Sequence, residues 1–340
     1  MPTLNRASAG IRFGACRRRF QGTTIAVLVA LLVSSVAQAQ NAPGTWRVAE
    51  GRVLRALGDT SVALPNQWVT LHRVGPDTAA PLDSVQTDAR GKFDFRYQLS
   101  GSRDAIYFAS STHGGIAYFT PPLTGATTER GALELVVFDT SSVSRPLSVR
   151  GRHVIVGAPA PSGGRTVIEV FEISNDSSVT LVAGPGDAPT FTAMVPRTAS
   201  AFQVRESDVA KDAITLRDGR VEVRAPIAPG LRQIAFSYEM PKRAKALRFP
   251  VERPTPVLEV LAEEPLARIG GGAVTEVDPV TIDGRGFRRY LAQDPPPAGV
   301  VTMEFPATPT ATRQLYLAVV IVAVGAAMLA ALARAAMRRR

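Results

Sequence analysis

The three histidines are the first residues to weigh for chemistry, because imidazole serves both acid–base catalysis and metal binding. They are His72, His113 and His153. None belongs to a His-Glu-x-x-His pattern, and none is followed three residues later by the glutamate of a zinc carboxypeptidase pair. The sequence also lacks a Gly-x-Ser-x-Gly elbow and a phosphate-binding glycine loop. We therefore predict that the three histidines are ordinary residues of strands or loops. We also predict that the chain has no catalytic residue and is not an enzyme.

The carboxylates and the cysteine also give no indication of a catalytic or metal-binding site. Glu263-Glu264 and the acids at 208 and 212 lie close in sequence, but a catalytic pair does not follow without the fold. Asp176 and Asp187 lie in predicted loops, where such residues either form turns or bind calcium. The ligand spacing of an EF-hand is absent. The single cysteine, Cys16, lies in a predicted signal peptide, which excludes disulfides, thiolate zinc sites and iron–sulfur clusters from the mature chain. We expect no cofactor and no metal.

Aromatic side chains are the remaining candidates for a binding site, because exposed rings stack on sugars and pack on peptides. Trp68 alternates with Val69 and Leu71, which places it on the outer face of a strand if those two face the core. The chain is poor in aromatics, at 6% of residues, and most rings of a sandwich belong to its core. A glycan or peptide surface is therefore an alternative function, with these ligand contacts: Trp46, Trp68, Tyr107, Tyr118 and Phe119.

The elements that position these residues are short stretches in which apolar side chains recur at every second position. This alternation indicates β-strands. Residues 92–97 alternate charged side chains with Phe93, Phe95 and Tyr97, and residues 231–240 repeat the scheme. Asp218-Gly219 separates two apolar pairs, which predicts a two-residue hairpin turn. No exported stretch has a long helical period. We predict an all-β ectodomain of tandem β-sandwiches.

The exported region divides at changes of composition. A first module over 44–140 ends in a polar Thr-Ser-Ser stretch, and a second sandwich covers 145–262. Residues 263–306, with a triple glycine and a triple proline, form a small third unit or an extension of the second. Residues 307–314 are rich in proline and threonine and predict a stalk.

Both ends of the chain carry an apolar run next to arginines. Residues 1–39 have the basic start, short apolar core and Ala-x-Ala site of a signal peptide, with Ala37 and Ala39 predicting cleavage after residue 39. Residues 315–333 carry no charge and are long enough for one membrane-spanning helix. The tail at 334–340 is predicted to be cytoplasmic because of its arginines, Arg334, Arg338, Arg339 and Arg340.

The net charge of +10 does not indicate nucleic-acid binding. Nine arginines lie in the predicted signal and the tail, which leaves a formal charge of +1 for the rest. No basic stripe remains to bind phosphates, so we expect no nucleic-acid partner.

Residues 48–140 contain a recognisable pattern: a Gly-Arg-Val start, a Leu-Pro-Asn turn, and Thr87-Asp88 followed by Gly91, Phe93 and Phe95. This pattern resembles the carboxypeptidase regulatory-like module, a transthyretin-like β-sandwich. The stretch also makes physical sense, because Asp88 can cap a turn that Gly91 closes. The resemblance implies a non-catalytic accessory module that supports folding or recognition.

Together these features predict a single-pass envelope protein with its ectodomain in the periplasm or outside the cell. We expect a structural, scaffolding or protein-interaction role with a protein partner in the envelope; glycan or peptide binding is the alternative and a hydrolase a minor one. The sequence leaves open the partner, the oligomeric state, a one- or two-membrane envelope, and export by the general or the twin-arginine route.

Overall fold

The computed structural model describes residues 46–123, 133–143 and 145–305. This part of the chain is all-β, as predicted, and its one helical element is the 3₁₀ turn η1 (Lys211–Ala213). No helix in these ranges is long and apolar enough to cross a membrane. The predicted signal peptide, stalk, membrane-spanning segment and arginine tail lie outside the described residues.

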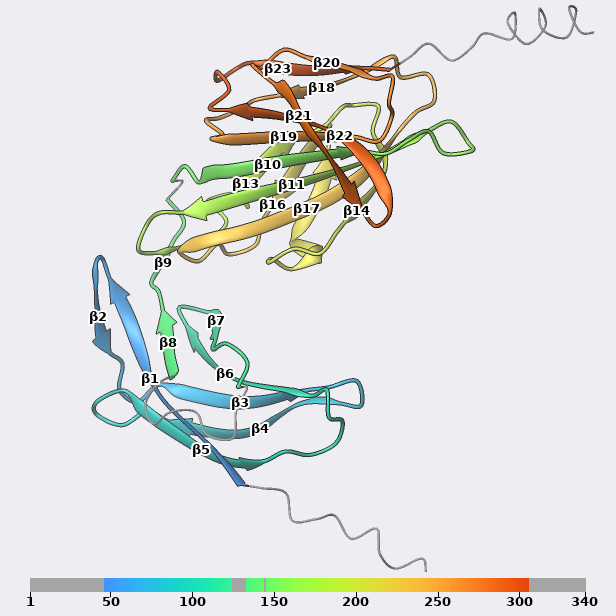
Figure 1. Ribbon diagram of the computed structural model, residues 1–340. Helices are drawn as coiled ribbons and strands as arrows, with labels where there is room; N and C mark the ends of the chain where they lie inside the picture. Colours follow the sequence, from blue (N-terminus) through green and yellow to red (C-terminus); the bar gives the residue numbers. More distant parts are fainter. Residues whose placement is uncertain (1–45, 124–132, 144, 306–340) are drawn as a thin grey trace, which may run out of the picture.

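The first unit consists of two four-stranded sheets (Figure 1). One has the order β2-β1-β5, with β8 pairing in parallel with β1; the other has the order β4-β3-β6-β7. The strands are β1 (Trp46–Leu57), β2 (Thr60–Ala63), β3 (Trp68–Val74), β4 (Ala79–Gln86), β5 (Lys92–Gln98), β6 (Ile106–His113), β7 (Ile116–Phe119) and β8 (Leu133–Val137).

Alternating side chains bring both sheets of the first unit onto one core. On β5, Phe93, Phe95 and Tyr97 are buried while the charged residues between them are exposed, which confirms the predicted pattern. Because successive side chains of a strand point to opposite faces, each strand contributes every second residue to the core. The other members of this core are Ala49, Val53, Val69, Leu71, Tyr107, Ala109, Tyr118, Leu135 and Val137.

The turn between β4 and β5 carries the chain from one sheet to the other. Asp88 Oδ1 accepts hydrogen bonds from the backbone N–H groups of Arg90 and Lys92, each at 2.8 Å. Gly91 has a φ of +71°, and its carbonyl accepts a hydrogen bond from the Val53 N–H of β1. A left-handed conformation at this point favours glycine. The predicted capping role of Asp88 is confirmed.

The second unit contains one seven-stranded sheet, β14-β17-β11-β10-β19-β22-β21, and two three-stranded sheets, β13-β16-β15 and β18-β23-β20 (Figure 1). The strands of the large sheet are β10 (Ser148–Val156), β11 (Arg165–Asn175), β14 (Ser200–Val204), β17 (Gly230–Met240), β19 (Val257–Ala262), β21 (Thr275–Ile282) and β22 (Arg285–Gln293). The small sheets contain β13 (Phe191–Met194), β15 (Ile214–Arg217), β16 (Arg220–Val223), β18 (Ala246–Pro250), β20 (Arg268–Gly270) and β23 (Val300–Glu304).

A parallel pair, β10 and β19, joins the two halves of the seven-stranded sheet. Residues 263–305 supply β20 to β23, which pair with strands from earlier in the chain, β22 with β19 and β23 with β18. One hydrophobic core extends from Leu147 to Phe305. Residues 263–305 therefore share the sheets and the core of the region before them.

Two local predictions in the second unit have different outcomes. The Asp218-Gly219 turn joins β15 to β16, and both turn residues have positive φ, so the hairpin is confirmed. The alternation predicted along 231–240 is wrong, because every residue from Ile234 to Tyr238 is buried. The segment after β14 continues along the edge of β17, where the Ser207 hydroxyl donates to the Ala235 carbonyl and accepts from the Ala235 N–H. From this segment, Arg205 donates to the buried Ser237 hydroxyl at 2.8 Å.

A short parallel bridge connects the two units. β9 (Thr140–Ser141), which follows the first unit, pairs with β12 (Thr180–Leu181) of the second. The Thr180 N–H donates to the Asp139 carbonyl, and the Thr180 hydroxyl shares a 2.7 Å hydrogen bond with the Tyr118 hydroxyl. Tyr118 belongs to the core of the first unit, so this contact links that core to the second unit.

Candidate binding face

The outer side of the sheet β4-β3-β6-β7 gathers exposed aromatic rings from three strands. Trp68 on β3 is 58% exposed and Phe119 on β7 is 60% exposed. Their strands bury Val69, Leu71 and Tyr118 on the opposite side. Trp68 thus has the outward orientation that its phase predicted.

Two further rings, His72 and Phe108, form a cluster with Phe119 on this surface. The His72 ring lies on the Phe108 ring with centroids 5.2 Å apart and an interplanar angle of 17°. Phe108 meets Phe119 edge to face, with centroids 5.7 Å apart. The register explains both contacts, because His72 is the cross-strand partner of Phe108 and Phe119 that of Ser110. We call the outward residues of this sheet the aromatic face.

The aromatic face contains no Asp, Glu, Lys or Arg on β3, β6 or β7. Exposed aliphatic side chains extend it beyond the rings, with Val74 and Ile106 at its margin. The outward residues of these strands are Trp68, Thr70, His72, Val74, Ile106, Phe108, Ser110, Thr112, Ala117 and Phe119. A surface without charges is unusual in a soluble domain, whose exposed positions are mostly occupied by charged and polar residues.

Hydroxyl groups between the rings are held by neighbours within the sheet. The Thr70 hydroxyl shares a 2.9 Å hydrogen bond with Ser84 of β4, and His72 Nε2 lies 2.7 Å from the Ser110 hydroxyl. These bonds fix the orientation of the His72 ring against Phe108 without a charged group. The face is consequently ordered by its own contacts and chemically suited to an uncharged, partly apolar ligand surface.

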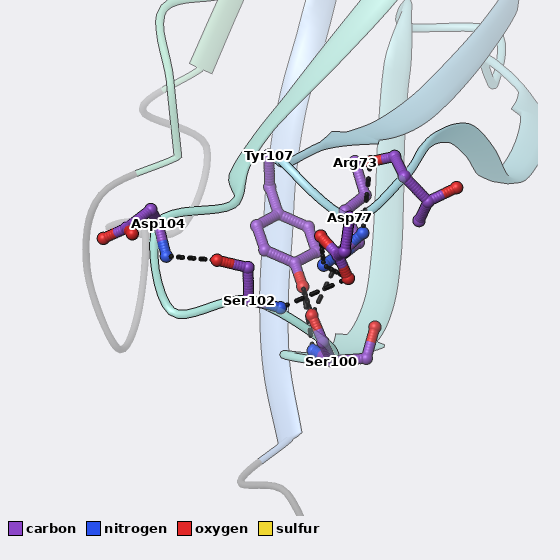
Figure 2. A network of polar contacts seen from close by, with 7 residues as sticks. Arg73, Asp77, Ser100, Ser102, Asp104 and Tyr107 are labelled. Carbon is purple, nitrogen blue, oxygen red and sulfur yellow. Dashed lines mark hydrogen bonds and ion pairs between the residues drawn. The ribbon is translucent and has the colours of Figure 1, made fainter.

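Tyr107, one of the aromatics predicted to contact a ligand, is instead a core residue of the first unit (Figure 2). Its hydroxyl accepts a hydrogen bond from the Ser100 N–H at 2.9 Å and donates to the Ser100 carbonyl. Beside it, the buried Arg73 donates to both carboxylate oxygens of Asp77 at 2.8 Å and to the Ser100 carbonyl. Figure 2 shows that this network ties the β3–β4 turn to the loop before β6.

The network also lowers the pKa of Asp77 below its usual value, chiefly through the hydrogen bond from Arg73. The Tyr107 hydroxyl and the Arg73 guanidinium are both occupied by other parts of the fold (Figure 2). The role of Tyr107 is therefore structural, and its ring is not available for stacking on a ligand.

The other two predicted aromatics also lie away from the aromatic face. Tyr118 is buried, and its hydroxyl donates to the Phe138 carbonyl at 3.0 Å, so it too is a core residue rather than a ligand contact. Trp46 is 58% exposed, but it begins β1 on the opposite sheet, where the Arg96 guanidinium lies 5.6 Å from its ring centroid. Of the five predicted aromatics, only Trp68 and Phe119 lie on the aromatic face.

The histidines lie in three different environments. His72 belongs to the aromatic face; His113 ends β6 and lies 3.1 Å from Asp139. His153 lies in the middle of β10, with Nδ1 2.7 Å from a Glu259 oxygen. Hydrogen bonds from His153 and Arg289 outweigh the effect of burial and lower the pKa of Glu259. Among the described residues, no group of His, Cys, Asp and Glu is arranged to hold a metal ion.

Sequence reasoning missed Phe108 and the part that His72 plays. Phe108 and His72 are 36 positions apart in the chain, and only the register of β3 with β6 brings them together. The alternation of outward residues along 68–74 and 106–112 contained a signal, since neither stretch places a charge at an outward position. Pairing the two stretches required the strand order.

Comparison with known proteins adds no assignment for this chain. No protein-family model matches the sequence, and no curated protein matches it.

Proposed function

We propose that this chain is a non-catalytic, membrane-anchored interaction protein of the cell envelope, which binds a protein partner through the aromatic face. The observation that carries the proposal is the set of rings on one outer sheet face: the exposed Trp68 and the cluster of His72, Phe108 and Phe119, with no Asp, Glu, Lys or Arg among the outward residues of β3, β6 and β7. The cores of protein–protein interfaces are depleted in charge and enriched in aromatic residues, as this face is.

The aliphatic side chains around the rings favour a protein over a sugar. Val74 and Ile106 are each exposed at the margin of the aromatic face. Sugars stack on flat rings but gain little from branched aliphatic side chains, whereas a protein surface packs against both. Burial of apolar area, at about 25 cal/mol per Å², would stabilise such a complex.

The location in the envelope rests on the two ends of the chain. The signal peptide predicted over 1–39 and the membrane-spanning helix predicted over 315–333 would hold the tandem β-sandwiches on the non-cytoplasmic side. The resemblance of residues 48–140 to a carboxypeptidase regulatory-like module supports an accessory role. The capped turn at Asp88 and the two facing sheets of the first unit are compatible with such a module.

The proposal is tested by chemical crosslinking of the tagged full-length protein in intact cells, followed by mass spectrometry. Phe119→Ser removes a ring from the aromatic face, and Asp94→Ser is the matched control on the opposite sheet. We expect one partner to be crosslinked by the wild type and by Asp94→Ser, and to be lost with Phe119→Ser. Equal recovery of that partner with both variants would argue against the aromatic face.

Glycan binding is the second candidate, and a specific observation favours it. Trp68 presents an exposed ring, and the hydroxyls of Thr70, Ser84 and Ser110 lie on the same face. A ring beside hydroxyl groups is suited to stacking on a sugar and bonding its oxygens. Co-sedimentation of the full-length protein with purified cell-wall polysaccharide distinguishes the two: loss of sedimentation with Trp68→Ala would support the glycan, and no sedimentation of the wild type would exclude it.

A further inference from the structure

A cleft in the second unit, remote in sequence from the aromatic face, is lined by three arginines and no acidic residue. It has a volume of about 630 Å³, within the range of small-ligand sites. Its walls come from the start of β10, the segment leading into β13, and the connection between β18 and β19. The arginines are Arg145, Arg150 and Arg253.

Arg253 is the residue that distinguishes this cleft. It is half-buried, its guanidinium lies 4.8 Å from the centroid of the Phe191 ring, and it donates to the Thr192 carbonyl at 3.1 Å. Among the described residues, no carboxylate oxygen lies within 4.0 Å of its nitrogen atoms. The neighbouring Glu252 instead faces Arg220 at 3.6 Å and accepts the Met194 N–H.

Other arginines in comparable positions of this unit do hold a carboxylate. The clearest case is Arg152, which is buried and donates to Glu169 at 2.7 Å. The same holds for Arg165 with Glu264, Arg224 with Glu222, Arg288 with Glu276 and Arg289 with Glu259. Burying a charge without a counter-charge is costly, so a half-buried guanidinium facing a cleft is an open position for an anion. Burial also lowers the pKa of Arg253, an effect that a bound anion would oppose.

A hollow of similar size on the first unit shows the contrast. It has a volume of about 640 Å³ and contains Arg52 and Lys92 together with Glu50, Asp88 and Asp94. Its lining charges are mixed, so it has no preference for either sign. The side chains that line the cleft around Arg253 carry charges of one sign only. Arg150 is compensated by Asp176 outside the lining, so Arg145 and Arg253 supply the positive charge that attracts anions.

The walls of the cleft indicate which anion fits. Four of its lining residues are prolines, which have no backbone N–H: Pro146, Pro189, Pro254 and Pro256. A phosphate is typically held by several backbone donors, whereas a carboxylate is satisfied by the two parallel N–H groups of one guanidinium. Leu147, Phe191 and the proline rings offer an apolar surface for the body of the ligand.

We propose that this cleft binds a carboxylate carried on an apolar body, with Arg253 as the anchoring residue and Arg145 attracting the charge; Arg150 is already paired with Asp176 at 2.8 Å. The carboxylate belongs to a small organic acid or to the end of a polypeptide, and both have the same chemistry at Arg253. This site is independent of the partner proposed for the aromatic face.

The test is calorimetric titration of the full-length protein in detergent with two acids and their neutral amides. The probes are 4-phenylbutyrate with 4-phenylbutyramide, and N-acetyl-prolyl-leucyl-phenylalanine with its C-terminal amide. We expect each acid to bind saturably and each amide at least tenfold more weakly. Tighter binding of the peptide acid by tenfold or more identifies a polypeptide carboxylate; equal binding identifies a small acid.

Arg253→Gln should weaken the binding of either acid at least tenfold, and Arg248→Gln, an exposed arginine of β18 outside the cleft, should leave it unchanged. If Arg253→Gln fails to fold, the exposed Arg145→Gln serves instead, with an expected weakening of about threefold from lost charge attraction. Equal binding of acid and amide, wild-type affinity in folded Arg253→Gln, or no binding of either acid would overturn the proposal.

Discussion

The two sheets of the first unit share one core but present opposite chemistry to their surroundings. The sheet of β1 and β5 exposes Arg52, Lys92, Asp94 and Arg96. In the other sheet, the outward residues of β3, β6 and β7 include rings and hydroxyls but no Asp, Glu, Lys or Arg, and the exposed Asp83 lies on the edge strand β4. Since both sheets bury similar apolar residues, folding alone does not require the difference. We therefore attribute the difference in charge between the two outer faces to function.

The charged face shows what an outer sheet face needs for solubility alone. Its long charged side chains are well hydrated, and they discourage association with other proteins. The aromatic face lacks such charged side chains and exposes Trp68 and Phe119, each of which is more than half accessible to solvent. We interpret this as a surface that is covered in the working protein.

The largest expected effect comes from the shared core. Phe95 is almost fully buried and contacts Phe93, so Phe95→Ala leaves a cavity that the surrounding rings cannot fill. A change of this kind costs about 3–5 kcal/mol in the free energy of unfolding. Chemical denaturation of the full-length protein measures it. A loss below about 1 kcal/mol would mean that the two sheets do not depend on a common core.

The next effect concerns the turn that joins the sheets. Gly91 has a φ of +71°, and a Cβ atom added there would lie 2.8 Å from the Val53 carbonyl oxygen. Gly91→Ala should therefore destabilise the first unit by about 2 kcal/mol, since the left-handed conformation and the clash both oppose it. Gly58→Ala is the matched control, because it also has positive φ but no atom within 4 Å of the added Cβ. The comparison of the two unfolding midpoints isolates the clash, and equal midpoints would refute it.

The third effect separates binding from stability. Trp68→Ala combined with Phe119→Ala removes exposed rings, so the free energy of unfolding should change little. Affinity for the crosslinked partner should fall at least tenfold, equivalent to about 1.4 kcal/mol. Thermal unfolding measures the change in stability, and titration with the purified partner measures the change in affinity. A large loss of stability with unchanged affinity would reverse the roles that we assign to these rings.

The smallest effect lies in the second unit and depends on pH. Hydrogen bonds from Ser148, Ser174 and Arg150 lower the pKa of Asp176 from 3.8 to about 2. Because the pKa is lower in the folded state, this carboxylate stabilises the fold above about pH 4 and loses that contribution as the pH falls toward 2. Asp176→Asn should flatten the acid side of the stability curve. An unchanged slope between pH 4 and pH 2 would show that Asp176 gains nothing from these contacts.

Local features of the fold could be predicted from the sequence, because they depend on neighbours in the chain. The alternation of Phe93, Phe95 and Tyr97, the capping of the turn by Asp88 and the Asp218-Gly219 hairpin all follow from short-range patterns. The outward orientation of Trp68 followed in the same way. These features depend on the period of a strand and on the backbone preferences of single residues.

Features that depend on strand order could not be predicted. The parallel pairing of β10 with β19 joins Gly151 to Val257, and no local pattern specifies that partner. The sequence places Tyr107 and Tyr118 among the expected ligand contacts, because an aromatic ring has the same sequence signal on either face of a strand. Their hydroxyls are satisfied inside the fold, by Ser100 and by Phe138 with Thr180.

The most direct test of the aromatic face is site-specific photocrosslinking in intact cells. A benzoylphenylalanine residue replaces Thr70, in the middle of the aromatic face, or Asp94, on the charged face of the other sheet. We predict that illumination links the variant at Thr70 to one defined envelope protein and gives no such product at Asp94. The same product at both positions, or a product at Asp94 alone, would contradict the assignment of the aromatic face as the binding surface.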